Sequence, residues 1–279
     1  MAKIRFGLVG LDWADLPLRD LFATTAQFGA TCLEVFYRDN CQPGDGGKVR
    51  ALAEEFGIMV EVVSSRAKLN TDPAEGIPWV RETIRHAVTA GARACAFMIG
   101  GNPSLSYRQA MKAVVENLEP LLDEADRVGI ELRVENVFSR VPEDITATAD
   151  GCLELCELLE GRLRLHFDPC NAMIAGEEAF PYSWRLLRPY IGSIHLKDAV
   201  RYRSDLYPEL GTERLMVDHI RGAFISVPLG RGAMNLAGFL PELKDFDGPV
   251  LIELFCSPRE RDRYWSQSRA WLKQQGIWT

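Results

Sequence analysis

Residues 129–138 read GIELRVENVF, and the two faces of this stretch differ in their chemistry. Side chains of an extended strand alternate between opposite faces. One face here carries Glu131, Arg133 and Glu135, and the other carries Leu132, Val134 and Asn136. Helical patterns flank the stretch, so neither face belongs to an ordinary solvent-facing hairpin. A closed barrel accounts for both faces, because helices cover the outside of its strands while the inner face lines the barrel.

The rest of the chain repeats a unit of strand, helix and glycine. Amphipathic patterns at 75–91, 106–128 and 150–160 separate short apolar runs. The expected strands are 4–10, 31–36, 58–65, 94–100, 130–136, 163–169, 191–198 and 249–254. Eight such units predict an α/β fold, a (β/α)8 TIM barrel, as a single domain over residues 1–279. The alternative is an open doubly wound sheet, which normally has a glycine-rich phosphate turn after its first strand. Residues 10–17, GLDWADLP, lack such a turn.

The composition restricts the classes of partner that this protein is expected to bind. The 279 residues include 32 basic and 39 acidic side chains, a formal net charge of −7, which weighs against a nucleic-acid partner. The seven cysteines form no CxxC pair, and we interpret them as reduced thiols of a cytoplasmic protein. No run of 18 apolar residues and no signal-peptide pattern is present, so no membrane partner is expected.

The same alternation places a polar side chain on the inner face of four successive strands, at or near the carboxyl end. These residues are Glu135, Asp168, His195 and Glu253. Three carboxylates buried side by side repel one another, and a divalent cation removes that cost. This donor set suits Mn²⁺, Mg²⁺ or Co²⁺, and Zn²⁺ is compatible. The alternative is that each side chain is satisfied separately, by a core salt bridge, a turn or a packed imidazole.

At these positions the sequence resembles the sugar phosphate isomerase/epimerase family, part of the xylose-isomerase-like (β/α)8 superfamily. The resemblance is carried by RVENVF (133–138), LHFDPCNA (165–172), IHLKDA (194–199) and residues 227–254. It implies one divalent ion held by the four side chains above, and it implies acid and base roles for Glu135 and Glu253. The implied activity is isomerisation or epimerisation of a sugar, sugar phosphate or polyol-derived ketone through an enediolate. A dehydratase or lyase of the same superfamily and a non-catalytic sugar-binding barrel are the alternatives.

Several residues are expected to contact the substrate. Asn171 is a candidate for a hydrogen bond to a sugar hydroxyl, and it departs from the pattern of ketose epimerases, which carry a histidine three residues after the aspartate ligand. Arg231 occupies a variable, commonly acidic position of the PLGxG loop and is a candidate for binding a carboxylate or phosphate. The other candidates are Lys197, Arg66 and Trp13, each with core packing or simple solvent exposure as the alternative.

Two further expectations concern the barrel interior and its mouth. Arg133 and His166 are expected below the metal, with Arg133 paired to Glu34, to Glu61 or to a ligand glutamate, and with His166 orienting the ligands. The stretch 199–228 after the seventh strand is predicted to be an extended loop. It is either a tolerated insertion or a functional segment, which would be a lid or a contact of a homo-oligomer.

Overall fold

The computed structural model describes residues 4–138, 144–206 and 214–278, and within them eight parallel strands close into a barrel. In order around the barrel the strands are β1 (Arg5–Val9), β2 (Cys32–Phe36), β3 (Met59–Lys68), β4 (Ala94–Met98), β5 (Glu131–Glu135), β6 (Arg164–Phe167), β7 (Ile191–Leu196) and β11 (Pro249–Ile252). The barrel closes where β1 pairs with β11, Phe6 opposite Val250. All eight predicted strands and the predicted fold are therefore confirmed.

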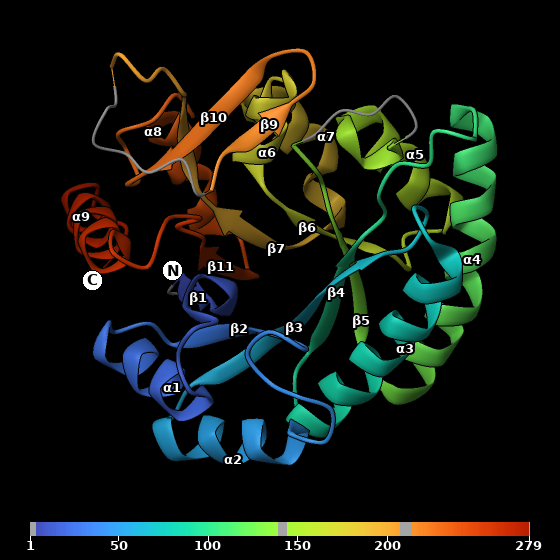
Figure 1. Cartoon of the computed structure of the whole chain (residues 1–279), viewed down its shortest axis with the longest axis horizontal. Coiled ribbons are helices and arrows are strands. Elements are labelled where there is room, and N and C mark those ends of the chain that lie inside the picture. Colours follow the sequence, from blue (N-terminus) through green and yellow to red (C-terminus); the bar gives the residue numbers. More distant parts are fainter. Residues whose placement is uncertain (1–3, 139–143, 207–213, 279) are drawn as a thin grey trace.

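Helices cover the outside of the barrel (Figure 1). They are α1 (Leu18–Gln27), α2 (Gly46–Phe56), α3 (Pro73–Ala90), α4 (Tyr107–Val128), α5 (Ala149–Leu158), α6 (Pro169–Ala175), α7 (Trp184–Leu187), α8 (Leu236–Phe239) and α9 (Arg261–Gln274). None of the helices in the described ranges is both long and apolar enough to span a bilayer.

Local sequence explains where the long helices begin and end. Ser106 and Gln109 form a capping box at the start of α4, and Asp72 accepts from the third residue of α3. Gly91 and Gly129 end these two helices in the left-handed conformation, which glycine adopts without a Cβ penalty. The predicted helices at 75–91, 106–128 and 150–160 correspond to α3, α4 and α5.

The hydrophobic core has two layers, one on each side of the barrel wall. The outer layer packs the outward side chains of the strands, such as Leu132 and Val134, against the helices. The inner layer is a smaller cluster around Val9, Val62 and Leu251. On β5, β6 and β7 polar side chains line the interior instead, and this difference leaves room for chemistry on one side of the barrel.

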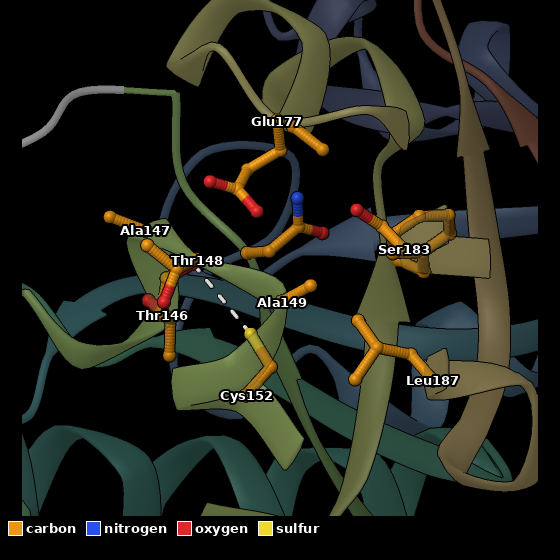
Figure 2. A pocket seen from close by; sticks show the side chains of 11 residues that line it. Thr146, Ala147, Thr148, Ala149, Cys152, Glu177, Ser183 and Leu187 are labelled. Carbon is orange, nitrogen blue, oxygen red and sulfur yellow. Dashed lines mark hydrogen bonds between the residues drawn. The ribbon is translucent and has the colours of Figure 1, made fainter. Parts of the chain in front are cut away.

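Between α5 and α6 the packing leaves a small cavity of about 10 Å³, lined by residues that include Thr146, Cys152 and Glu177 (Figure 2). A space of this size holds at most about one water molecule. It is therefore a packing defect near the barrel rather than a site for a substrate.

The prediction of an extended loop at 199–228 was partly wrong, because the described residues of this stretch include a three-stranded antiparallel sheet. Strand β8 (Asp198–Arg201) continues from β7, and β10 (Gly222–Val227) pairs with both β8 and β9 (Met216–Asp218). Residues 207–213 lie outside the described residues. Buried Ala199, Met216 and Phe224 pack this sheet onto Cys170 and Ile174 of α6, so short-range pairing and burial order a stretch with weak periodicity.

Candidate metal centre

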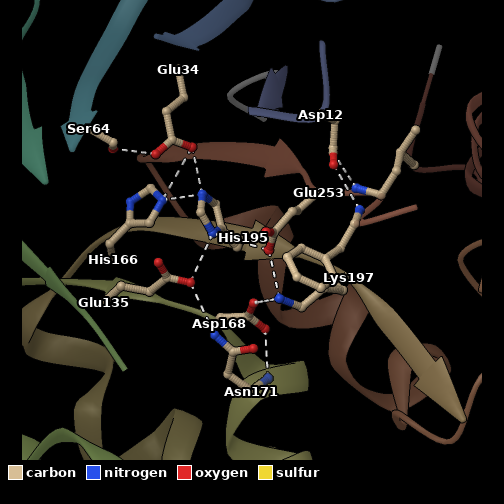
Figure 3. A network of polar contacts seen from close by, with 12 residues as sticks. Asp12, Glu34, Ser64, Glu135, His166, Asp168, Asn171, His195, Lys197 and Glu253 are labelled. Carbon is tan, nitrogen blue, oxygen red and sulfur yellow. Dashed lines mark hydrogen bonds and ion pairs between the residues drawn. The ribbon is translucent and has the colours of Figure 1, made fainter. Parts of the chain in front are cut away.

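The four side chains predicted as metal ligands meet at the carboxyl end of the barrel (Figure 3). Glu135 ends β5, Asp168 follows β6, His195 lies on β7 and Glu253 follows β11. One donor atom from each of the four lies within 4.8 Å of the donor atoms of the others. Opposite ligands of one ion of this class lie about 4.0–4.6 Å apart, twice the metal–ligand distance, so a spacing of this order fits a shared ion. Their role as ligands stays a prediction.

The position of Asp168 is fixed by the start of a helix and by the neighbouring strand. Its Oδ1 atom accepts from the backbone N–H of Asn171 at 2.9 Å and so caps α6. The Asn136 amide binds both the N–H and the C=O of Asp168, at 2.7 and 2.9 Å. The sequence grouped Asn136 with the outward residues of its strand. Because β5 ends at Glu135, the strand alternation no longer applies to Asn136, and its side chain hydrogen-bonds the backbone after β6 instead.

Lys197 lies between two of the four side chains. Its Nζ atom is 2.7 Å from Asp168 Oδ2 and 2.7 Å from Glu253 Oε2, and the side chain is fully buried. Burial disfavours a charged lysine, but these two carboxylates outweigh it and raise the pKa of Lys197 well above its usual value. Burial also raises the pKa of Asp168 to about 6, against the opposing effect of Lys197. For Glu253, burial is outweighed by Lys197 and His195, and the pKa is lowered.

His195 has a carboxylate at each ring nitrogen. Its Nε2 atom is 2.6 Å from Glu34 Oε2, and its Nδ1 atom is 3.3 Å from Glu135 Oε1 and 3.5 Å from Glu253 Oε2. Burial opposes the charge, yet Glu34 and Glu135 raise the pKa of His195 well above its usual value. Glu34 thus fixes the Nε2 proton, so that Nδ1 faces the other carboxylates. A carboxylate in this position orients a metal-binding imidazole.

The sequence predicted that Glu34 points into the barrel, but it did not predict that Glu34 contacts His195. It lies on β2 and reaches His195 on β7, 161 residues further along the chain. The signal was a glutamate within the otherwise apolar strand CLEVF. Ser64 donates to the other oxygen of Glu34, so both oxygens of this buried carboxylate are engaged.

His166 belongs to the same network, as expected. Its Nε2 atom contacts Nε2 of His195, and its Nδ1 atom contacts the Ser193 hydroxyl. Burial, reinforced by the neighbouring His195, lowers the pKa of His166. We therefore assign a neutral ring to His166.

Asp12 also belongs to the site, although the sequence analysis did not identify it. It accepts from the backbone N–H groups of Leu254 and Phe255, at 2.6 and 2.9 Å. These residues directly follow Glu253, so Asp12 holds the end of β11 in place. Burial and the charge of Glu253 raise the pKa of Asp12 to about 7.

The charges of this buried cluster leave room for a cation. Glu34, Glu135, Asp168 and Glu253 supply four carboxylates, and Lys197 and His195 supply two positive charges. The excess is two negative charges in a site where unpaired charge is costly. The donor set and the charge therefore both fit one divalent ion, held by Glu135, Asp168, His195 and Glu253.

The residues predicted to contact substrate lie in different places in the structure. Asn171 lies in the cluster, and its Nδ2 atom donates to Glu135 Oε1 at 3.1 Å and to the Asn136 carbonyl at 3.0 Å. Arg66 is exposed and pairs with Asp39 at 2.6 Å. Arg231 is exposed on the loop that follows β10.

Trp13 requires a correction. Its side chain is 1% exposed, packs edge-on against Phe28 and lies beneath the guanidinium of Arg261. The residue follows β1 in a 3-10 turn (Gly10–Trp13), where strand alternation no longer predicts direction. Trp13 is a core residue in this structure, which was the alternative to substrate contact.

The partner predicted for Arg133 was wrong. Its Nε atom contacts Glu131 Oε1 at 2.5 Å, and the side chain lines a cavity at the amino end of the barrel. Glu61 pairs instead with Arg5 at 3.0 Å. Arg133 does face the interior, as the alternation predicted, but from the middle of β5 its side chain lines the cavity at the amino end, away from Glu135.

Comparisons with known proteins agree with this geometry. The family model described as xylose isomerase-like TIM barrel matches residues 22–275. The chain belongs to the xylose isomerase-like TIM barrel family. A search of curated proteins returned no significant match.

Solved structures show the same fold across the whole of this xylose isomerase-like barrel. A xylose isomerase domain containing protein from Salmonella typhimurium LT2 superposes with a TM-score of 0.76 at 18% identity, covering 99% of this chain and 98% of the other. A probable 3-DHS dehydratase from Bacillus anthracis gives 0.75 at 16% identity, covering 96% and 98%. A D-allulose 3-epimerase from Methylomonas sp. gives 0.74 at 19% identity, covering 99% of each chain. At these identities the likeness establishes the fold alone.

Proposed function

We propose that this chain is a divalent-metal-dependent isomerase or epimerase acting on a sugar, a sugar phosphate or a polyol-derived ketone. The observation that carries the proposal is the meeting of Glu135, Asp168, His195 and Glu253 around one point. That point lies at the carboxyl ends of the strands, where TIM-barrel enzymes hold their active sites. The D-allulose 3-epimerase with the same fold supports the reaction class.

Glu135 and Glu253 are the proposed acid and base. They come from different strands and both approach Nδ1 of His195, at 3.3 and 3.5 Å, so two carboxylates flank one point. One takes a proton from the carbon next to the substrate carbonyl, and the other returns a proton to the opposite face. Lys197 keeps Glu253 ionised at neutral pH because it lowers the pKa of that carboxyl despite burial.

When bound, the divalent ion would polarise the carbonyl and its neighbouring hydroxyl and so stabilise the enediolate of the substrate. The chain itself orients the reacting groups. Glu34 holds the ring of His195, and Asp12 holds the segment after Glu253. The Oδ1 atom of buried Asn171 has no hydrogen-bond partner among the described residues and is available to a substrate hydroxyl.

A dehydratase remains the second candidate, on one specific observation. The position after Asp168 where ketose epimerases carry a histidine is occupied by Asn171, which cannot exchange a proton with a substrate hydroxyl at neutral pH. The probable 3-DHS dehydratase shares the fold. Such an enzyme would use the same carboxylate base and then expel a hydroxyl group from the enolate.

The test is solvent deuterium exchange. Protein loaded in turn with Mn²⁺, Mg²⁺, Co²⁺ and Zn²⁺ is incubated in D2O with ketoses, ketose phosphates and inososes, and the products are examined by NMR. Deuterium at the carbon next to the carbonyl, without loss of water, is the expected result. Exchange with loss of water would establish the dehydratase instead, and no exchange with any compound would favour a sugar-binding barrel.

The variant Glu253→Gln links the exchange to the site. The amide keeps a ligating oxygen but cannot accept the proton, so turnover should fall by at least ~10²-fold while metal stays partly bound. Glu116→Gln, the same change at an exposed position of α4, is the matched control and should exchange normally. Full activity of metal-loaded Glu253→Gln would remove this residue from the acid–base assignment.

A further inference from the structure

A second polar cavity lies at the amino ends of the barrel strands, on the face opposite the candidate metal centre. Its volume is about 300 Å³. Its lining includes the first residues of β1, β5, β6, β7 and β11. Five arginines line it, namely Arg5, Arg93, Arg133, Arg164 and Arg188.

Four of these arginines form ion pairs with two glutamates, so each glutamate is shared by two arginines. Arg5 and Arg93 share Glu61, at 3.0 and 3.9 Å. Arg133 and Arg164 share Glu131, at 2.5 and 3.9 Å.

The fifth arginine, Arg188, donates to the backbone carbonyl of Asp245 rather than to a carboxylate. Asp245 and Asp247 also line the cavity, but neither forms an ion pair with the arginines within the described ranges. The lining therefore holds five guanidinium groups and four carboxylates, a formal excess of one positive charge, and within the described ranges the arginines form ion pairs with two of these carboxylates, Glu61 and Glu131.

The pairing of β5 with β6 places two of these arginines, Arg133 and Arg164, side by side although their charges repel. Arg133 and Arg164 are register partners on the adjacent strands β5 and β6, roughly 4.8 Å apart at the backbone. Arg133 is 6% exposed, and its Nη1 atom has no hydrogen-bond partner among the described residues. The Nε atom of Arg164 is likewise buried without a hydrogen bond in the described part of the chain, since Glu131 Oε2 lies 3.9 Å away. A buried guanidinium with unpaired N–H groups is costly unless an anion completes it.

We propose that this cavity binds the phosphate group of a small phosphorylated molecule. A phosphate presents several acceptor oxygens and two negative charges, which suits the planar donor forks of neighbouring arginines. Arg133 and Arg164 both line this cavity, and each keeps a buried N–H group without a hydrogen-bond partner among the described residues, so one phosphate can accept from both once these side chains turn toward it. The volume matches the lower end of small-molecule sites, enough for a phosphate with a short organic group.

The site stands apart from the proposed catalysis. Glu135 is the last residue of β5, whereas the cavity is lined by Glu131, the first residue of that strand, so the phosphate site is reached from the other face of the barrel. A cluster that served stability alone would pair each arginine. This cluster leaves donors open, and positions built for a ligand commonly lower stability until the ligand binds.

The test is binding of inorganic phosphate to the full chain at constant ionic strength, balanced with sodium chloride. Calorimetry and thermal unfolding are followed up to about 20 mM phosphate, which saturates a site of millimolar affinity. We expect saturable binding and a rise in Tm of about 3 °C. Arg164→Gln, which removes a partly exposed cation, should weaken binding at least about tenfold, the loss of one charge-assisted contact.

Arg108→Gln is the matched control, because Arg108 is exposed on α4 far from the cavity in the fold. It should bind phosphate as the native chain does. Arg133→Met is a second test at the buried position, and a folded Arg133→Met that binds no phosphate would support the same site. Equal binding by Arg164→Gln and the native chain would overturn the proposal, as would no binding at 20 mM. Acetate binding as tightly as phosphate would overturn the assignment to phosphate.

Discussion

At the residue scale, Lys197 supplies a positive charge between two carboxylates that are also predicted to hold a metal. Lys197→Met keeps most of the side-chain volume and removes the charge. Without metal, Asp168 and Glu253 then lose their shared partner, and the free energy of unfolding should fall by roughly 3–5 kcal/mol. Affinity for Mn²⁺ should rise by at least about tenfold, because a repelling cation has gone.

Thermal unfolding with and without Mn²⁺, together with calorimetric titration, measures both effects. Lys48→Met, an exposed lysine of α2, is the matched control and should change neither quantity. Lower metal affinity in Lys197→Met would mean that the lysine helps to hold the ion rather than competing with it.

His195 makes metal binding depend on pH. In the metal-free structure Glu34 and Glu135 raise the pKa of this histidine above its usual value, whereas a metal needs the neutral ring. Binding therefore releases a proton, and affinity should rise about tenfold per pH unit below the pKa of His195. Asp168, with its pKa of about 6, adds a second proton to this release below pH 6. Calorimetry in buffers of different ionisation enthalpy counts the protons, and a pH-independent affinity between pH 6 and 8 would refute the assignment.

Side-chain direction was predictable from the sequence inside strands and for two residues directly after them. The period of two placed Glu135 and His195 on inner faces, it also held for Asp168 and Glu253 after β6 and β11, and the convergence of the four followed from barrel closure. Trp13 lies beyond the end of β1, so no periodicity constrained it. Partners across the barrel, such as Glu34 for His195, depend on strand tilt and stagger, which alternation does not encode.

At the element scale, Asp198 joins β8 to the loop that carries Arg231. Its carboxylate accepts from the backbone N–H groups of Gly230, Gly232 and Met234 at 2.8–3.1 Å, and Gly232 leaves no space for a Cβ beside it. The PLGRG stretch is therefore shaped by the aspartate of the HLKD stretch, about 30 residues earlier in the chain.

Asp198→Asn should release this loop, since an amide NH2 would oppose N–H donors that the carboxylate now accepts. We expect a loss of about 1–3 kcal/mol in the free energy of unfolding and faster amide hydrogen exchange at 229–234. Asp262→Asn, at an exposed position of α9, is the control. Unchanged exchange in the loop would show that other contacts hold it.

The antiparallel sheet β8–β10–β9 shows where element prediction failed. Its strands are three to six residues long, and β9 and β10 are joined by a tight turn at 219–221. Such short strands leave little periodicity to detect, and their pairing depends on contacts with α6. The barrel strands could be predicted because each is a buried apolar run followed by a helix.

At the scale of the whole molecule, the barrel separates two charged regions. Carboxylates gather at the carboxyl end of the strands, and arginines gather at the amino end. Apolar side chains such as Val9, Val62 and Leu251 fill the interior on the side of β1, β3 and β11. The sequence predicted the barrel and its carboxylates, but it gave Arg133 the wrong ion-pair partner, because alternation predicts the face of a strand and not which carboxylate a long side chain reaches.

The most direct test of the proposed centre is a crystal of the native chain soaked in Mn²⁺ and measured at the manganese absorption edge. One anomalous peak is expected, about 2.0–2.3 Å from ligand atoms of Glu135, Asp168, His195 and Glu253. His195 should bind through Nδ1, with Nε2 still held by Glu34. No peak at the barrel mouth, or a peak bound by other residues while these four keep their ion pairs with one another and with Lys197, would contradict the account.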